Sequence, residues 1–223
     1  MTRAAMVFAA GHGTRMRPLT DDRPKALVQV AGRALLDHAL EQVAGPGPLA
    51  VNAHHHARQI EAHLAGGPAQ VLVEENALLD TGGGLKNALP VLGAGPVVTM
   101  NGDAVWHGPA ARATLTEAWD PERMDGLLLI VPADRAINAE ALSFGLEQDG
   151  RLTRETRDHA FTGAGIVKID GLAAFEGVFS LRDLWWKMLA AGRLFGVVHP
   201  GHWAEVGRPE HIAPAEAMLA RLR

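Results

Sequence analysis

A glycine-rich loop directly behind an apolar run near the N-terminus is the feature that most constrains this chain. Residues 4–9 are apolar and predict a buried strand, and the loop that follows reads Ala9-Ala10-Gly11-His12-Gly13-Thr14. Small residues let a phosphate chain approach the backbone, whose N–H groups donate to anionic oxygens. Arg15, Arg17 and Lys25 follow at once and add cationic side chains suited to phosphate. We therefore expect this stretch to bind an oligophosphate.

Two common phosphate-binding motifs do not match this loop. The sequence holds no Gly-x-x-x-x-Gly-Lys-Ser/Thr run, so it is not a P-loop. The dinucleotide fingerprint needs a third glycine three positions after Gly13, where this chain has Met16. The missing glycine disfavours a dehydrogenase of the Rossmann type.

Length and charge narrow the class of protein. A chain of 223 residues can bury one good core. With 21 Lys+Arg against 25 Asp+Glu it is mildly acidic, which argues against a general binder of nucleic acid or membrane surfaces. The absence of cysteine excludes disulfides, thiolate metal sites and a cysteine nucleophile. No signal peptide and no apolar run of about 20 residues is present, so we expect a cytoplasmic protein.

Apolar periodicity predicts an α/β fold. In the first half, expected strands over 4–9, 49–52, 70–74 and 96–100 alternate with helices over 35–43 and 57–64 and with a loop and short helix over 75–92. Such alternation is typical of βαβ units in a parallel, doubly wound sheet. In the second half we expect helices over 110–119, 181–191 and 209–222, strands over 126–131, 161–169 and 195–199, and a hairpin over 144–153.

The chain shows no linker, repeat or low-complexity segment. We therefore expect a single domain over residues 1–223. Its first half, to about residue 110, would hold a nucleotide, and its second half, from about residue 111, would close over a second substrate.

Asp103 is a candidate magnesium ligand. It follows the predicted strand over 96–100, and ligands of open α/β sheets bind outside the carboxyl ends of strands. Mg²⁺ takes one or two protein carboxylates together with phosphates and water. The alternative is a turn aspartate that caps the next element.

Two further stretches are candidates for nucleotide contacts. Asp80-Thr81-Gly82-Gly83-Gly84 offers bare backbone against which a flat base can lie, or else forms a flexible turn before a helix. Asn52 precedes three adjacent histidines, His54 to His56, whose side chains cannot all face one point on a strand or helix. We expect them to form a loop at a strand end that helps to orient a nucleotide, rather than a zinc site.

The N-terminal loop resembles the signature of the sugar-phosphate nucleotidyltransferases, G-x-G-T-R-M/L-x-P-L-T followed by P-K, which here stands at residues 11–20 with Pro24-Lys25. The resemblance is strong over residues 4–32, good over 80–103 and patchy after 140. It implies a glycosyltransferase-A-like fold, with a mostly parallel Rossmann-like sheet and a small β-rich sugar-binding lobe. The form Thr-Gly-Gly-Gly-x-x-x-Ala-Leu at Thr81 resembles the subgroup that uridylylates N-acetylmuramic acid 1-phosphate.

This resemblance assigns roles to particular residues. Arg15, Lys25 and Asp103 would be catalytic, and Asp103 would share a metal ion with Glu205. Glu205 stands where family members usually have the Asp of Trp-x-Asp-x-Gly. The alternative for Glu205 is a carboxylate that favours the start of the closing helix. The expected nucleotide-binding residues are Ala9, Ala10, Gly11, His12, Gly13, Thr14, Arg15, Asn52, Thr81, Gly82 and Gly83.

On the sugar side the resemblance implies Lys25, Gly145, Glu155 and Gly165 as sugar-phosphate-binding residues, although Arg154-Glu155-Thr156 replaces the more usual Glu-Lys pair. Trp185 and Trp186 belong to an amphipathic stretch, and we expect them to pack in the core or at a dimer contact, with one ring as an alternative border of the sugar site.

The implied reaction is attack of a sugar 1-phosphate on the α-phosphate of a nucleoside triphosphate, which releases pyrophosphate and leaves an NDP-sugar. Arg15 would hold the outer phosphates, Lys25 would bridge the α-phosphate and the incoming phosphate, and Mg²⁺ would neutralise charge. We expect UTP and N-acetylmuramic acid 1-phosphate as substrates in cell-wall recycling, with a monomer or homodimer as the working form. Alternatives are guanylyl, thymidylyl or cytidylyl transfer to mannose, heptose or glucose 1-phosphate or to phosphocholine, and a non-catalytic sugar-nucleotide sensor.

Overall fold

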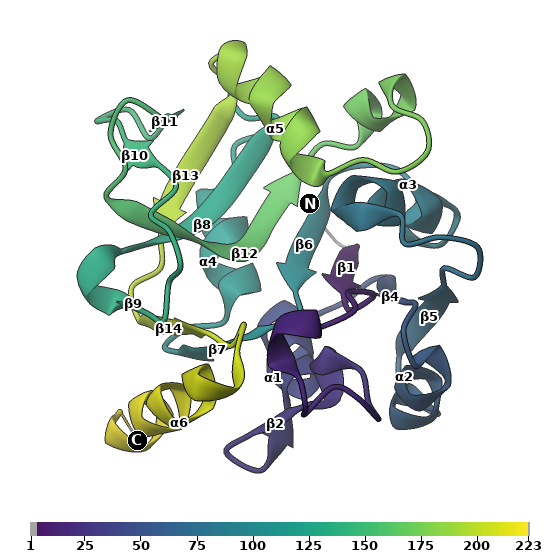
Figure 1. Cartoon of the computed structure of the whole chain (residues 1–223). Coiled ribbons are helices and arrows are strands. Elements are labelled where there is room, and N and C mark those ends of the chain that lie inside the picture. Colours follow the sequence, from purple (N-terminus) through teal and green to yellow (C-terminus); the bar gives the residue numbers. More distant parts are fainter. Residues whose placement is uncertain (1–3, 223) are drawn as a thin grey trace.

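A seven-stranded sheet forms the centre of the computed structural model, which describes residues 4–222 (Figure 1). Its strands are β1 (Ala5–Phe8), β4 (Leu49–Ala53), β5 (Ala69–Val73), β6 (Val97–Asn101), β8 (Gly126–Pro132), β12 (His159–Val167) and β13 (Leu194–Val198). They lie in the order β13-β8-β12-β6-β1-β4-β5. Only β12 runs antiparallel to its neighbours in this sheet, so the predicted mostly parallel sheet is confirmed.

Helices cover both faces of the sheet (Figure 1). They are α1 (Leu35–Val43), α2 (Ala57–Leu64), α3 (Asp80–Leu92), α4 (Ala111–Ala118), α5 (Leu181–Ala190) and α6 (Ile212–Arg221). Successive side chains of β1 point to opposite faces, so Val7 packs in the cluster with α1, α2 and α4 while Met6 packs in the cluster with α3 and α5. This two-sided burial explains the continuous apolar run of β1. Within residues 4–222, no helix combines the length and apolarity needed to cross a membrane.

Smaller elements flank the main sheet. A three-stranded sheet has the order β7-β14-β9, built from β7 (Ala104–His107), β9 (Ala136–Ile137) and β14 (His202–Glu205). Two hairpins pair β2 (Gln29–Val30) with β3 (Arg33–Ala34) and β10 (Gly145–Leu146) with β11 (Leu152–Thr153). Short 3-10 helices lie over Thr14–Met16, Lys25–Leu27, Ala133–Arg135, Asp170–Ala174 and Pro209–His211. The predicted hairpin over 144–153 is confirmed, whereas the three-stranded sheet is a feature that the sequence analysis missed.

Helix α3 corrects the expectation of a loop over residues 80–84. The helix begins at Asp80 and includes all three glycines, although each glycine weakens a helix by about 1 kcal/mol relative to alanine. Close packing explains why glycine stands here. A Cβ atom on Gly82 would collide with the ring of Phe179, and one on Gly84 would lie 2.8 Å from Nδ2 of Asn52. The glycines therefore let the start of α3 pack against neighbouring segments.

The two tryptophans of α5 pack in the core with α3, as expected. Trp185 is buried and contacts the ring of Phe161 edge-on, with 4.8 Å between ring centroids. Trp186 is partly buried, and the guanidinium of Arg154 lies over its ring at 4.7 Å. The Trp185 contact holds α5 against β12, and the Trp186 contact joins α5 to the segment between β11 and β12.

Candidate active site

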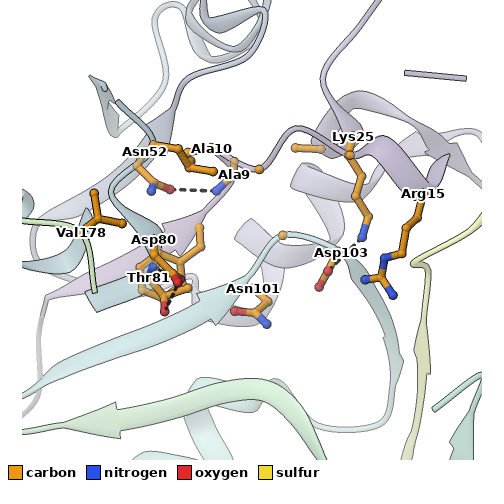
Figure 2. Close-up of a pocket in the computed structure, with 16 residues that line it drawn as sticks. Ala9, Ala10, Arg15, Lys25, Asn52, Asp80, Thr81, Asn101, Asp103 and Val178 are labelled. Carbon is orange, nitrogen blue, oxygen red and sulfur yellow. Dashed lines mark hydrogen bonds and ion pairs between the residues drawn. The ribbon is translucent and has the colours of Figure 1, made fainter. Parts of the chain in front are cut away.

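A cavity of about 530 Å³ opens beyond the carboxyl ends of β1, β4 and β6. Figure 2 shows Arg15, Lys25 and Asp103 at one end of it and Asn52 and Val178 at the other. The lining consists of Phe8, Ala9, Ala10, Gly11, Gly13, Arg15, Lys25, Ala26, Asn52, Leu78, Asp80, Thr81, Asn101, Gly102, Asp103 and Val178. The structure thus brings most of the predicted nucleotide and catalytic residues to one cavity, while His12, Thr14, Gly82 and Gly83 are outside its lining.

Asn52 fixes the start of the glycine-rich loop. Its Oδ1 accepts a hydrogen bond from the N–H of Ala9 at 2.9 Å, and its Nδ2 donates to Oε1 of Glu74 at 2.7 Å. The other oxygen of Glu74 accepts from the N–H of Leu79 at 2.8 Å. One chain of hydrogen bonds therefore joins the loop to β4 and to the segment that follows β5, and both ends of the Asn52 amide are engaged in it.

Gly13 allows the loop to approach Lys25. Its φ of +63° lies in the left-handed region that favours glycine. A Cβ atom at Gly13 would lie 2.8 Å from Cβ of Lys25, and the hydroxyl of Thr20 donates to the Gly13 carbonyl at 2.9 Å. The turn at Gly13 therefore determines where the Lys25 side chain enters the cavity.

The two predicted catalytic cations each contact a carboxylate. Nζ of Lys25 donates to Oδ2 of Asp103 at 3.0 Å (Figure 2), and these side chains are only 15% and 31% exposed. Arg15 pairs with Glu140, whose carboxylate also accepts from Nε of Arg208 at 3.2 Å. Hydrogen bonds from Arg15 and then from Arg208 hold the pKa of Glu140 below its usual value. Sequence reasoning missed Glu140, because it lies 125 residues beyond Arg15 in the chain.

Glu205 lies beside Asp103 because β14 pairs with β7. Glu205 is opposite Ala104 in this ladder, and the N–H of Val206 donates to the carbonyl of Asp103 at 2.9 Å. Burial, followed by the charges of Asp103 and Glu140, raises the pKa of Glu205. Burial and the nearby carboxylates both disfavour the charged form of Glu205, and a divalent cation bound beside Asp103 would offset both effects.

The donor set fits magnesium better than zinc. In the part of the chain that the structure describes, no three His, Asp or Glu side chains form a cluster that could hold a metal by themselves. Mg²⁺ needs only one or two protein carboxylates when phosphate oxygens and water complete its shell. The carboxylates of Asp103 and Glu205 are oxygen donors of this kind. Asp103 lines the cavity beside the loop expected to hold phosphates, whereas Glu205 is outside that lining.

The glycines of α3 are engaged with protein groups. The N–H groups of Gly82 and Gly83 both donate to the carbonyl of Phe179, at 3.0 and 3.1 Å. Thr81 lines the cavity, and its hydroxyl donates to Oδ1 of Asp80. A direct contact of Gly82 or Gly83 with a nucleotide stays a prediction.

A second cavity of about 280 Å³ adjoins the first and shares Phe8, Asp80, Thr81 and Asn101 with it. Its remaining lining is Thr99, Phe161, Gly163, Ser180, Leu181, Arg182 and Trp185. Trp185 thus borders a cavity as well as packing in the core.

The predicted sugar-side residues Gly145, Glu155 and Gly165 line neither of these two cavities. Gly145 lies in β10, where a Cβ atom would collide with Oγ1 of Thr156. Glu155 is exposed and its N–H donates to Oγ1 of Thr153, while Gly165 is buried inside β12. Their contact with a sugar phosphate stays a prediction.

Several lining residues were not singled out as site residues from the sequence. Asn101 ends β6 two residues before the predicted ligand Asp103, a position that could have marked it. Val178 is 60% exposed and belongs to the segment between Phe175 and Ser180, which lies far along the chain from the loop. Only the packing of that segment on α3 brings Val178 to the cavity.

The histidines form the expected loop at the end of β4. The ring of His12 lies 5.3 Å from that of His54 and 5.8 Å from that of His55, and the rings of His55 and His56 are 4.0 Å apart. Burial, together with the charges of the neighbouring histidines, lowers the pKa of His55. The ring of His54 also contacts the carbonyl of Glu74, so the cluster packs against the hydrogen-bonded chain of Asn52.

Comparison with known proteins agrees with this geometry. The sequence model described as MobA-like NTP transferase domain matches residues 5–207. An N-acetylmuramate alpha-1-phosphate uridylyltransferase of Caulobacter vibrioides is 42% identical, over 98% of this chain and 97% of the relative. A protein of the same name from Neisseria meningitidis is 33% identical, over 96% and 97%. A mannose-1-phosphate guanylyltransferase of Mycobacterium tuberculosis is 27% identical, over 97% of this chain and 64% of the relative.

Solved structures show the same fold. The inositol-1-phosphate CTP transferase from T. maritima superposes with a TM-score of 0.80 at 17% identity, covering 99% of this chain and 96% of that one. A UDP-glucose pyrophosphorylase complexed with UDP-glucose also has a TM-score of 0.80, at 16% identity and full coverage of both chains.

Proposed function

The chain belongs to the MobA-like NTP transferase family, and on that premise we propose that it joins UTP to N-acetylmuramic acid 1-phosphate, giving UDP-N-acetylmuramic acid and pyrophosphate. The observation that carries the proposal is the Lys25–Asp103 pair facing the glycine-rich loop in one cavity. The name shared by the two relatives above 30% identity supports the choice of nucleotide and sugar.

Lys25 stabilises the reacting phosphates. An oxygen of the sugar phosphate attacks the α-phosphorus of UTP, and the bond from that phosphorus to the β-phosphate bridge breaks as pyrophosphate leaves. The attacking group is already an anion, so positioning and charge neutralisation contribute most of the catalysis and no strong base is needed. Lys25 lies where its ammonium can exchange Asp103 for phosphate oxygens.

Arg15 holds the outer phosphates of UTP and then pyrophosphate. Its guanidinium offers paired donors that suit phosphate, and Glu140 engages these donors in the structure. Arg208 contacts the same carboxylate, so phosphates that displace Glu140 meet two cationic side chains.

Asp103 and Glu205 would hold Mg²⁺. When bound, Mg²⁺ supplies positive charge against the α-phosphate oxygens. Both carboxylates must be ionised for this role. Burial raises the pKa of Glu205, and the positive charge of a bound Mg²⁺ would favour its ionised form.

The remaining assignments divide the chain into two halves within one domain over residues 1–223. The half to about residue 110 binds the nucleotide through the loop from Ala9 to Arg15 and through Asn52 and Thr81. The half from about residue 111 binds the sugar phosphate, with Lys25 reaching across. A monomer or a homodimer remains the expected working form.

A direct test is to incubate the protein with UTP, N-acetylmuramic acid 1-phosphate and Mg²⁺ and to identify products by mass. We expect UDP-N-acetylmuramic acid and pyrophosphate in equal amounts. Formation of neither product, with tight UTP binding, would contradict transfer and favour a sugar-nucleotide sensor.

A further inference from the structure

The side chain of Arg182 brings a positive charge to the second cavity and forms no contact that stabilises the described part of the fold. Its side chain is exposed and is part of the lining. Within residues 4–222 its guanidinium makes no ion pair, hydrogen bond or ring contact. Among the described residues that line this cavity it is also the one basic side chain.

The backbone of Arg182 is held firmly at the edge of the cavity. Ser180 caps α5: its hydroxyl accepts from the N–H of Arg182, and its own N–H donates to the carboxylate of Asp183 at 3.2 Å. The N–H of Leu181 donates to the hydroxyl of Thr81 at 2.9 Å. These hydrogen bonds attach the first turn of α5 to the start of α3, in the wall that the two cavities share. The backbone position from which the Arg182 side chain extends is therefore fixed.

The rest of the second cavity suits an acetylated sugar. The rings of Phe161 and Trp185 form an apolar wall, edge to face at 4.8 Å. Thr99 and Asn101 add polar groups on another side. Because Asn101 also lines the first cavity, a sugar whose 1-phosphate lies near Lys25 and Asp103 can extend past Asn101 into the second.

Asp80 is the one acidic residue in this lining, and one of its carboxylate oxygens is engaged inside α3. Oδ1 of Asp80 accepts hydrogen bonds from both the N–H and the hydroxyl of Thr81, at the first turn of α3. The basic group among these lining residues is the guanidinium of Arg182.

We propose that Arg182 binds the carboxylate of the lactyl ether of N-acetylmuramic acid 1-phosphate and so selects this sugar over N-acetylglucosamine 1-phosphate. The inference rests on the proposed function. The two sugars share the acetamido group and the 1-phosphate, and only the muramyl sugar carries the lactyl carboxylate. A planar guanidinium with paired donors matches a carboxylate, and a residue placed to meet that one group gives discrimination without touching the reacting phosphates.

The test compares kcat/KM for the two sugars at saturating UTP and Mg²⁺ in the wild type, Arg182→Ala and Arg182→Lys. Arg58→Ala removes an equally exposed arginine from α2, outside the lining of both cavities, and serves as the control. A charge-assisted contact with a carboxylate corresponds to about 10- to 100-fold in kcat/KM. Arg182→Ala should lose this factor for the muramyl sugar, mostly through KM, and leave the glucosamine sugar within about twofold.

Two further comparisons separate recognition of charge from a structural role. Arg182→Lys should recover part of the lost discrimination, because it keeps a cation on a flexible stem. Replacing the lactyl carboxylate by its carboxamide should lower kcat/KM for the wild type and leave Arg182→Ala nearly unaffected.

Two results would overturn the subsite while leaving the proposed function intact. One is a wild-type preference for the muramyl sugar that Arg182→Ala preserves, and the other is an equal loss for both sugars. A wild-type enzyme that shows no preference for the muramyl sugar would instead overturn the proposed function together with the subsite.

Discussion

At the scale of single residues, Arg15 and Lys25 contact carboxylates that phosphates would replace in the proposed reaction. The ammonium of Lys25 lies 3.0 Å from Asp103, and the turn at Gly13 determines its approach. Both side chains of this pair keep some contact with water, at 15% and 31% exposed, so removal of Lys25 leaves Asp103 hydrated. Its loss should therefore reduce catalysis far more than it reduces stability.

Lys25→Ala should lower kcat/KM by about 10²–10³, the usual cost of removing one preorganised charge that stabilises a transition state. Pyrophosphate release measures the rate, and thermal unfolding checks that the variant is folded. Arg58→Ala, which removes a surface cation, should retain wild-type turnover. Turnover of Lys25→Ala within a few-fold of the wild type would refute the role given to Lys25.

Glu205→Gln tests the second metal ligand. Loss of the carboxylate should raise the Mg²⁺ concentration for half-maximal rate by roughly 10- to 100-fold, by comparison with the effect of outer-shell partners. Glu205→Asp keeps the charge and should raise the Mg²⁺ concentration for half-maximal rate less than Glu205→Gln does. Because the fold raises the pKa of Glu205 and so favours its neutral form, Glu205→Gln should unfold at or above the wild-type temperature without metal. An unchanged Mg²⁺ requirement would remove Glu205 from the metal site.

At the scale of elements, the far edge of the sheet is tied together by Asp125 just ahead of β8. Its Oδ1 accepts from Lys168, after β12, at 2.9 Å, and its Oδ2 accepts from Arg193, before β13, at 2.8 Å. Burial raises the pKa of Asp125, but hydrogen bonds from Arg193 and Lys168 outweigh burial and hold the pKa below its usual value. One carboxylate thus joins three neighbouring strands.

Asp125→Asn should lower the free energy of unfolding at pH 7 by about 1 kcal/mol, since these partly exposed pairs are screened by water. A lowered pKa in the folded state gives stability that is present above the unfolded value of about 3.9 and lost as the pH falls through the folded value. The difference between wild type and variant in urea unfolding should therefore shrink below roughly pH 5. A difference that stays constant as the pH falls would show that the charge of Asp125 is not responsible.

Local patterns predicted most elements because burial on both faces makes continuous apolar runs, as in β1 and β6. Three features depend on distant contacts and could not be predicted in this way. Gly82 and Gly83 stand in a helix where their N–H groups donate to Phe179, which is 97 residues from Gly82 by sequence number. The sequence of a buried strand does not show whether it runs parallel or antiparallel to its neighbours, so the antiparallel direction of β12 could not be predicted. The two residues of β9 are too few to show a strand period.

The site, like the fold, combines residues that local sequence patterns indicate with residues that only distant contacts bring together. Residues of the glycine-rich loop, with Lys25, stand in a short motif of small and cationic residues that indicates phosphate binding. Asp103 became a candidate metal ligand from its place after a predicted strand and from the family resemblance. Val178, Glu140 and Arg182 reach the cavities or their charged groups only through tertiary packing, and nothing in their local sequence marks them.

At the scale of the whole molecule, one sheet supports two adjoining cavities. The first lies over the carboxyl ends of β1, β4 and β6, and the second lies between β6, β12 and the start of α5. Nucleotide and sugar phosphate would meet where the cavities share Asn101 and Thr81, close to the charged groups of the first. This arrangement accounts for a transfer reaction between two separately bound substrates.

The most direct test of this account is pyrophosphate release with Mg²⁺ across a matrix of UTP, GTP, dTTP and CTP against several sugar 1-phosphates and phosphocholine. The account predicts that release is fastest with UTP and N-acetylmuramic acid 1-phosphate, with kcat/KM about 10-fold or more above that of any other pair. Faster release with another pair would contradict the assigned substrates while retaining nucleotidyl transfer. No release with any pair, despite tight nucleotide binding, would contradict catalysis itself.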